Sequence, residues 1–388
     1  MPKKLIFIFL LALVLRLSLV GLAHHGDLNN NISWANLAFE RGLVNFYEGS
    51  NWPYSVPNQP PLYILVFTTI RAVSWFFGAN MEWLVKIPGI LADLGIAWLI
   101  YKYSKRWWLA AIWLVNPVSW YNSAVWGQTD AVVNFLGLLA VFALLDKKLV
   151  RMSIFYSLSI LYKPSLVIFA PILGFVALKQ KHHLGKWLDS VIAIGVTAAA
   201  VSVWFHPTDN LFSWLFNLYR DRILPGEIGY LTANAFNFWW LVNPGRVLDS
   251  TLYWNLSART WGFMIVIVGM VTLLHGLIRK YSDKRFLSVL AVVSLVTFLF
   301  LTRVHERYLF PFFPYATLLL MSPGVALPYI ILSLTHLLNL YHLFWAPSIP
   351  ALEALYTHTW FAKILSTINI GVLIYLFRQY NVFTRKIK

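Results

Sequence analysis

Long apolar blocks alternate with short polar segments along most of this chain. The blocks cover residues 5–23, 62–77, 83–101, 107–121, 131–145, 187–205, 260–278, 286–302, 309–322, 325–345 and 359–377, and a further stretch, 152–178, is interrupted by Tyr162-Lys163-Pro164-Ser165. A helix needs about 20 apolar residues to cross a bilayer, and most of these blocks approach that length. They predict an all-α, polytopic membrane protein with roughly ten to thirteen transmembrane helices, built as one integral membrane domain over residues 1–388.

Two longer polar sections, 24–60 and 206–258, interrupt the apolar pattern. The basic clusters lie elsewhere, at 102–106, 147–151, 179–186, 279–285 and the C-terminus. Because cytoplasmic loops are enriched in Lys and Arg, we expect both long sections on the outer face of the membrane. This scheme needs an odd number of crossings between residues 60 and 102, where two apolar blocks lie, so one of them is expected to be re-entrant or the cluster 102–106 to break the rule.

The first outer loop, 24–60, contains its own apolar positions. Trp34, Leu37 and Ala38, followed by the pair Phe46–Tyr47, predict short amphipathic helices that lie on the membrane surface.

Composition agrees with a membrane location. Apolar residues make up 59% of the chain, charged residues only 12%, and the mean hydropathy is +0.65, which a soluble protein of 388 residues could not bury. The net charge of +16 does not indicate nucleic-acid binding, because the basic residues sit in clusters between apolar blocks. There is no Cys, which excludes disulfides and thiolate catalysis.

Asp27 opens the first outer loop, directly after an apolar block. One interpretation is an ordinary helix N-cap, since Asp is common at that position. The other is a catalytic base at the membrane surface. Position alone favours the cap, so the catalytic interpretation depends on the neighbouring motifs.

The motif W-G-Q-T-D, residues 126–130, contains Trp126, Gln128 and Asp130. Asp130 precedes an apolar block and is either an N-cap for the following helix or a site residue. Gln128 and Asp130 are suited to binding sugar hydroxyls or to orienting Asp27. Lys163 interrupts an apolar stretch, where a lysine is costly unless it is paired or hydrated, so we expect it to contact an anionic group.

The segment H-E-R-Y holds His305, Glu306, Arg307 and Tyr308, and Arg303 precedes it. It is either an ordinary loop with an internal Glu–Arg pair or a phosphate site, since Arg clamps phosphate through a two-point contact. Arg220 and Arg222 have the same character. Cations beside acids suggest an anionic lipid phosphate that leaves from a sugar, here called the donor phosphate. We predict that the donor phosphate is bound by Arg220, Arg222, His305, Arg307 and Lys163. We predict that the rest of the substrates is bound by Trp126, Gln128, Asp130, Glu306 and Tyr308.

Neither a metal site nor a cofactor is expected. The pairs His24-His25 and His182-His183 are adjacent, so they do not face one way on a helix. The chain has no H-E-x-x-H and no G-x-x-x-x-G-K-[ST] motif. The energy for a reaction must therefore come with the substrate or from a gradient.

Taken in order, these motifs resemble the GT-C superfamily of membrane glycosyltransferases, which use polyprenyl-phosphate sugars. They are G-D-L-N-N-N-I-S-W-A with F-Y-E, P-P-L-Y, I-L-A-D-L, N-P-V-S-W-Y-N-S-A-V-W-G-Q-T-D-A, Y-K-P and H-E-R-Y-L-F-P. The chain is most similar to bacterial and archaeal relatives of the mannosyltransferase that adds the second mannose of GPI anchors. The glucosyltransferases that use dolichyl-phosphate glucose are more distant. Relatives often have D-Y-P-P-L where this chain has Asn58-Gln59-Pro60-Pro61-Leu62.

The resemblance implies that Asp27 is the general base, that Asp130 is a second acid near the active site, and that H-E-R-Y lies near the donor phosphate. It implies an inverting transfer of a hexose, of the mannose or glucose class, from a polyprenyl-phosphate donor to a lipid-linked or surface glycan on the outer face of the cell membrane. The alternative is a lipid-glycan flippase or sugar transporter, with Arg16, Arg71, Asp93 and Lys163 lining a path. A polymerase of surface glycan is a third, weaker option.

Overall fold

The structure, a computed structural model, describes residues 3–225 and 228–385, with side chains through residue 380. Nearly all of its regular elements are helices. The strands of the described residues are the two-residue pair β1 (Leu252–Tyr253) and β2 (Leu256–Ser257), which form one antiparallel hairpin. The prediction of an all-α protein is therefore confirmed. The chain forms two compact units: unit 1 comprises 1–12, 100–122 and 228–388, and unit 2 comprises 13–99 and 123–227.

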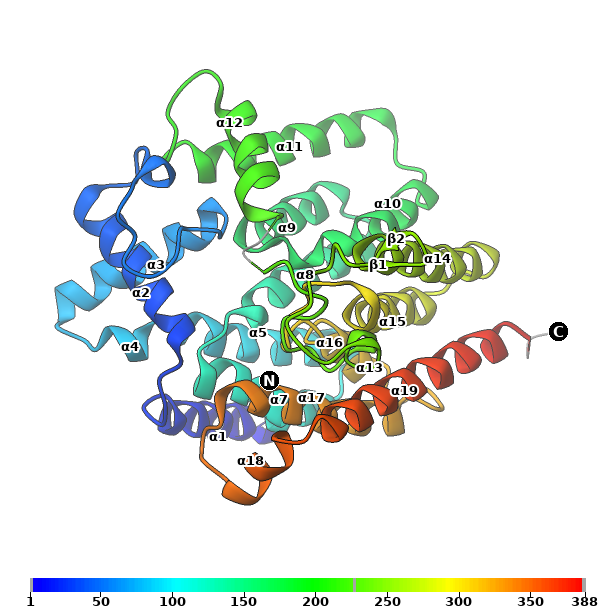
Figure 1. The fold of residues 1–388 in the computed structure, drawn as a ribbon. Coiled ribbons are helices and arrows are strands. Elements are labelled where there is room, and N and C mark those ends of the chain that lie inside the picture. The colour runs from blue at the N-terminus through cyan, green and yellow to red at the C-terminus, as the bar shows by residue number, and fades with distance from the viewer. Residues whose placement is uncertain (1–2, 226–227, 386–388) are drawn as a thin grey trace. The chain divides into compact units, whose positions relative to one another are not determined.

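Unit 2 is organised around α9. This helix packs against α8, α11 and α3, and α3 in turn packs against α2 (Figure 1). The elements of unit 2 are α1 (Lys3–Leu19, from residue 13), α2 (Gly26–Arg41), η1 (Phe46–Glu48), α3 (Pro61–Phe77), α4 (Met81–Leu84), α5 (Ile87–Ser104, to residue 99), α8 (Asp130–Leu145), α9 (Leu149–Tyr162), η3 (Pro164–Phe169), α10 (Ala170–Lys179), α11 (Leu184–Ser202), α12 (Leu211–Leu218) and η4 (Tyr219–Ile223).

Unit 1 is organised around α15, which is buried on almost every side and packs against α14, α16 and α19. Its elements are α6 (Trp107–Val115), α7 (Pro117–Trp120), the start of η2 (Tyr121–Trp126), α13 (Phe238–Val242), α14 (Ala258–Arg279), α15 (Asp283–Phe300), α16 (Phe312–Leu318), α17 (Ala326–Phe344), α18 (Pro350–Tyr356) and α19 (Thr359–Arg385), with β1 and β2.

Proline positions explain several helix ends. The ring of Pro164 disfavours a helical conformation at Lys163, which is extended (φ −162°, ψ 128°), so α9 ends at Tyr162 as predicted. Two predicted blocks are shorter than expected. Asn116 and Pro117 divide 107–121 into α6 and α7, and 309–322 contains only the seven-residue helix α16.

Five helical segments of the described residues are long and apolar enough to cross a bilayer: Met81–Ser104, Leu184–Ser202, Ala258–Arg279, Ala326–Phe344 and Thr359–Tyr380. Leu188, Val191, Ile192 and Val196 of α11 are each more than half exposed and follow one helical stripe. An apolar face of this kind needs lipid as its solvent. The protein is a multi-pass membrane protein, and the count of ten to thirteen spans stays a prediction.

Helices do form in the section 24–60, as α2 and η1. Their apolar residues are buried inside unit 2, however: Trp34, Leu37 and Ala38 on α2, and Phe46 and Tyr47 on η1, are each at most 9% exposed. The apolar face of α2 contacts protein, chiefly α3, and the expectation that these helices lie on the membrane surface stays a prediction. The sequence pattern shows that a face is apolar but does not show what covers it.

Candidate functional site

Asp27 lies in the first turn of α2. The N-cap position is taken by His25, whose Nδ1 accepts the Asp27 backbone N–H at 3.1 Å. In the neutral ring the proton therefore sits on Nε2. The Asp27 side chain is 39% exposed. A carboxylate in the first turn is also favoured by the positive end of the helix dipole. The helix is thus capped by its neighbour, and the Asp27 carboxylate remains partly open to the surroundings.

Gln128 lies beside this carboxylate. Its Nε2 donates to Asp27 Oδ2 at 2.7 Å, a contact between residues 101 positions apart. A hydrogen bond to an ionised oxygen is roughly twice as strong as a neutral one. Two roles were predicted for Gln128, binding sugar hydroxyls and orienting Asp27, and this contact matches the second.

Trp126, two residues earlier, is fully buried at the end of η2, a single π-helical segment. Its ring meets the His25 ring edge-on, with 5.1 Å between centroids. In this structure Trp126 therefore supports the N-cap of α2, and its predicted contact with substrate stays a prediction. Single π-helical turns are frequent at functional sites.

Asp130 and Lys163 form a buried ion pair. Lys163 Nζ lies 2.7 Å from Asp130 Oδ1, and the two side chains are 8% and 5% exposed. Asp130 is the first residue of α8 and Thr129 takes the cap position, so Asp130 is not the N-cap. The anionic group that Lys163 was expected to contact is this carboxylate in the present structure. Contacts of either residue with substrate stay predictions.

Arg220 and Arg222 lie on η4, a second π-helical segment. Arg220 makes a two-point contact with Asp221, at 2.6 and 2.7 Å, and this contact lowers the pKa of Asp221. Arg222 Nη1 donates to the backbone carbonyl of Tyr47. The Tyr47 hydroxyl in turn donates to the Gln59 carbonyl at 2.7 Å, and burial raises the pKa of Tyr47 well above its ordinary value. Arg222 is thus attached to the section 24–60.

The H-E-R-Y segment lies in unit 1 and forms a compact cluster. Glu306 is fully buried and accepts from Arg307 Nη1 at 2.7 Å. The guanidinium of Arg307 lies 5.7 Å from the Tyr308 ring centroid, and the ring of His305 lies 5.1 Å from the same centroid. The internal Glu–Arg pair of the simpler interpretation is therefore present. Arg307 and His305 keep partial exposure, at 13% and 25%.

A neighbouring ion pair holds the start of this segment. Arg303 Nε and Nη2 contact the two Asp249 oxygens at 2.6 and 3.1 Å, and Asp249 is almost fully buried. The Arg303 backbone adopts φ +62°, a left-handed conformation that non-glycine residues seldom adopt. The Ala233 N–H donates to the Val304 carbonyl at 2.9 Å.

The structure brings Asp27 together with Gln128, and Asp130 with Lys163, in unit 2. Sequence reasoning missed Lys86, a buried lysine whose ammonium contacts three backbone carbonyls. Its signal was present, because a lysine lies only three residues into the predicted block 83–101. Among the described residues, no cluster of three or more His, Asp or Glu side chains is arranged to hold a metal ion.

The comparisons with known proteins match the fold of this chain and not its sequence. No protein-family model matches the sequence, and no curated protein matches it. Among solved structures, a crystal structure of ArnT from Cupriavidus metallidurans bound to undecaprenyl phosphate is similar, with a TM-score of 0.54 and 14% sequence identity over 98% of this chain and 75% of ArnT. At this identity the likeness establishes the fold. The chain therefore has an ArnT-like fold.

Proposed function

We propose that this protein is an inverting glycosyltransferase that moves a hexose, of the mannose or glucose class, from a polyprenyl-phosphate donor to a lipid-linked or surface glycan acceptor on the outer face of the membrane. The observation that carries the proposal is the partly exposed Asp27 carboxylate, oriented by Gln128 at 2.7 Å in a chain with the ArnT-like fold. The donor class is supported by the undecaprenyl phosphate bound to ArnT.

Asp27 is the general base in this mechanism. The acceptor hydroxyl lies between the carboxylate and C1 of the donor sugar, and Asp27 takes its proton as the oxygen attacks C1. The bond from C1 to the phosphate oxygen breaks, and its electron pair leaves with the polyprenyl phosphate. Gln128 donates to Oδ2 and so orients the carboxylate for this proton transfer. General base catalysis contributes roughly 10²- to 10⁴-fold in rate.

The departing phosphate needs cations at the position where its charge develops. Arg222 is the strongest of the five predicted, because its guanidinium carries five N–H donors and its contact with the Tyr47 carbonyl uses only the Nη1 group. Arg220, Lys163 and Arg307 already contact carboxylates, and His305 is charged only when protonated. We propose Arg222 first for the phosphate contact, and Arg220, Lys163, His305 and Arg307 second.

The transport alternative loses support from two of its residues. Arg16 and Asp93, which were expected to line a path, are fully buried and contact each other at 3.2 Å. Ser123 Oγ donates to the same Asp93 oxygen at 2.6 Å. An ion pair whose opposite charges contact each other inside the protein is suited to holding helices together.

The proposal is tested with purified protein in proteoliposomes that contain labelled polyprenyl-phosphate mannose or glucose and a lipid-linked glycan extract as acceptor. The wild type should release free polyprenyl phosphate only when acceptor is present. Asp27→Asn should lower turnover by roughly 10²- to 10⁴-fold without changing thermal unfolding. Glu40→Gln, at an exposed acid on the same helix, is the matched control and should retain full turnover.

Two outcomes would contradict the proposal. Turnover of Asp27→Asn at the wild-type rate would remove Asp27 as the base. Movement of the intact labelled lipid across the bilayer, with no release of polyprenyl phosphate, would instead establish a flippase or transporter.

A further inference from the structure

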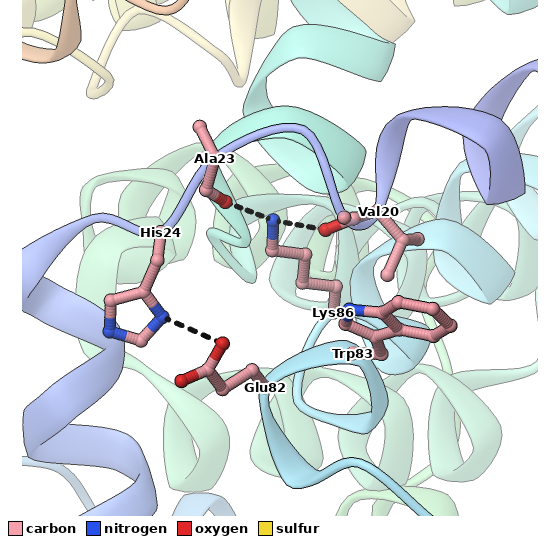
Figure 2. Close-up of a pocket in the computed structure, with 7 residues that line it drawn as sticks. Val20, Ala23, His24, Glu82, Trp83 and Lys86 are labelled. Atoms are coloured by element: carbon pink, nitrogen blue, oxygen red, sulfur yellow. Dashed lines mark hydrogen bonds and ion pairs between the residues drawn. The ribbon is translucent and has the colours of Figure 1, made fainter.

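Lys86 is a lysine whose side chain is enclosed by protein, at 2% exposure. Its ammonium donates to three backbone carbonyls, those of Val20, Ala23 and Val125, each at 2.8 Å. Figure 2 shows the side chain reaching the Val20 and Ala23 carbonyls from α4–α5. An ammonium carries three N–H donors, so every donor of Lys86 is used.

A cavity of about 90 Å³ lies beside this ammonium, with His24, Glu82 and Trp83 among its lining residues (Figure 2). A lysine next to a cavity suggests an anion site, but an anion would have to displace one of the three carbonyls. A buried carbonyl left without a partner loses its hydration and gains no hydrogen bond in return, which is unfavourable. The arrangement therefore indicates a structural link rather than a ligand site.

The three carbonyls belong to the two segments that carry the proposed base and its partner. Val20 and Ala23 lie between α1 and α2, seven and four residues before Asp27. Val125 lies on η2, three residues before Gln128. The Lys86 nitrogen thus joins the segment that carries Asp27 to the segment that carries Gln128, and these two side chains lie 2.7 Å apart.

Gly127 supplies independent evidence that these segments are held closely. Its backbone has φ +86°, a conformation that side chains disfavour. A Cβ added there would lie 2.7 Å from Leu28 Cδ2 and 3.0 Å from Lys86 Cγ. The turn that carries Gln128 is therefore packed between the lysine stem and the first turn of α2, next to Asp27.

We propose that Lys86 is a positioning residue for the proposed glycosyl transfer: by bridging the Val20, Ala23 and Val125 carbonyls, it fixes the relative placement of Asp27 and Gln128. This inference rests on the proposed function, because it assigns Lys86 an effect on catalysis through Asp27. A misplacement of about 1 Å at a reacting group can cost about 100-fold in rate.

The test compares Lys86→Met, which keeps the stem and removes the donors, with Glu82→Gln. The control removes a weaker link between the same segments, the His24–Glu82 contact at 3.8 Å between exposed side chains. In the proteoliposome assay, Lys86→Met should lower kcat about 10- to 100-fold and leave the KM for donor within about twofold. Glu82→Gln should match the wild type. Amide hydrogen exchange in 20–28 and 123–130 should become faster in Lys86→Met alone.

A double-mutant comparison separates positioning from general damage. In the Asp27→Asn background, Lys86→Met should lower the residual rate by less than about twofold, because the carboxylate it positions is gone. If Lys86→Met does not fold, Gly127→Ala perturbs the same junction while sparing the ammonium. It should lower kcat about tenfold, because the new methyl group separates the Gln128 turn from α2.

Wild-type kcat in folded Lys86→Met, or in folded Gly127→Ala, would overturn the inference and leave the role of Asp27 intact. An undiminished effect of Lys86→Met in the Asp27→Asn background would overturn it as well. Full activity of Asp27→Asn alone would instead refute the proposed function itself, so the two failures are distinguishable.

Discussion

The Arg16–Asp93 pair gives a quantitative prediction about what holds unit 2 together. Arg16 comes from α1, Asp93 from α5 and the second donor, Ser123, from η2. Both charged side chains have no exposed surface. Removing one partner leaves the other charge buried, which typically costs about 3–5 kcal/mol. Because Ser123 still donates to the carboxylate at 2.6 Å, we expect Arg16→Met to fall at the lower end, about 3 kcal/mol.

That loss corresponds to roughly 150-fold in the unfolding equilibrium, since about 1.4 kcal/mol is a factor of ten. For a unit of this size it should lower Tm by roughly 6–12 °C. The double replacement Arg16→Met with Asp93→Leu removes both charges, so it should recover most of the stability lost in the single variant. Thermal unfolding of the protein in detergent micelles measures both shifts under one set of conditions.

An exposed ion pair on α11 provides the control. Lys186 and Asp189 lie 3.1 Å apart, with about half of each side chain exposed. Lys186→Met should change the free energy of unfolding by less than about 1 kcal/mol. A Tm for Arg16→Met within about 2 °C of the wild type would refute the reasoning, and so would a double variant as unstable as the single one.

Three further predictions concern the candidate site. Gln128→Glu places a second carboxylate beside Asp27, so the two compete for one proton and the acid limb of the pH–rate profile should move to higher pH. An unmoved limb would mean that Gln128 does not contact the catalytic base. Arg303→Lys keeps the charge but loses the two-point contact with Asp249, and we expect a loss of about 1–3 kcal/mol in thermal unfolding; a value near zero would mean that a single contact suffices. Tyr47→Phe removes one partly buried hydrogen bond to the N-Q-P-P turn and should cost about 1 kcal/mol, with faster proteolysis of residues 24–60 as the readout. Unchanged proteolysis would show that the bond does not hold this section in place.

The helices were largely predictable from the sequence because their signals are local. Apolar blocks predicted α3, α8, α11, α14, α15 and α17 within about three residues at each end. The break after Tyr162 followed from the steric effect of Pro164 on Lys163. The pattern was less informative where an apolar face met protein instead of lipid, as at Trp34, because both environments select the same residues.

The sequence by itself determined a helical membrane protein and identified polar residues whose burial in it is unfavourable. These signals are local, because periodicity and proline positions act over a few neighbouring residues. Which of those residues meet was decided only by the tertiary structure. Gln128 contacts Asp27, 101 positions away in the sequence, and Lys86 donates hydrogen bonds to carbonyls 39 and 66 residues away. Such contacts depend on how distant helices pack, and a hydrogen bond within 3 Å has no local signature in the chain.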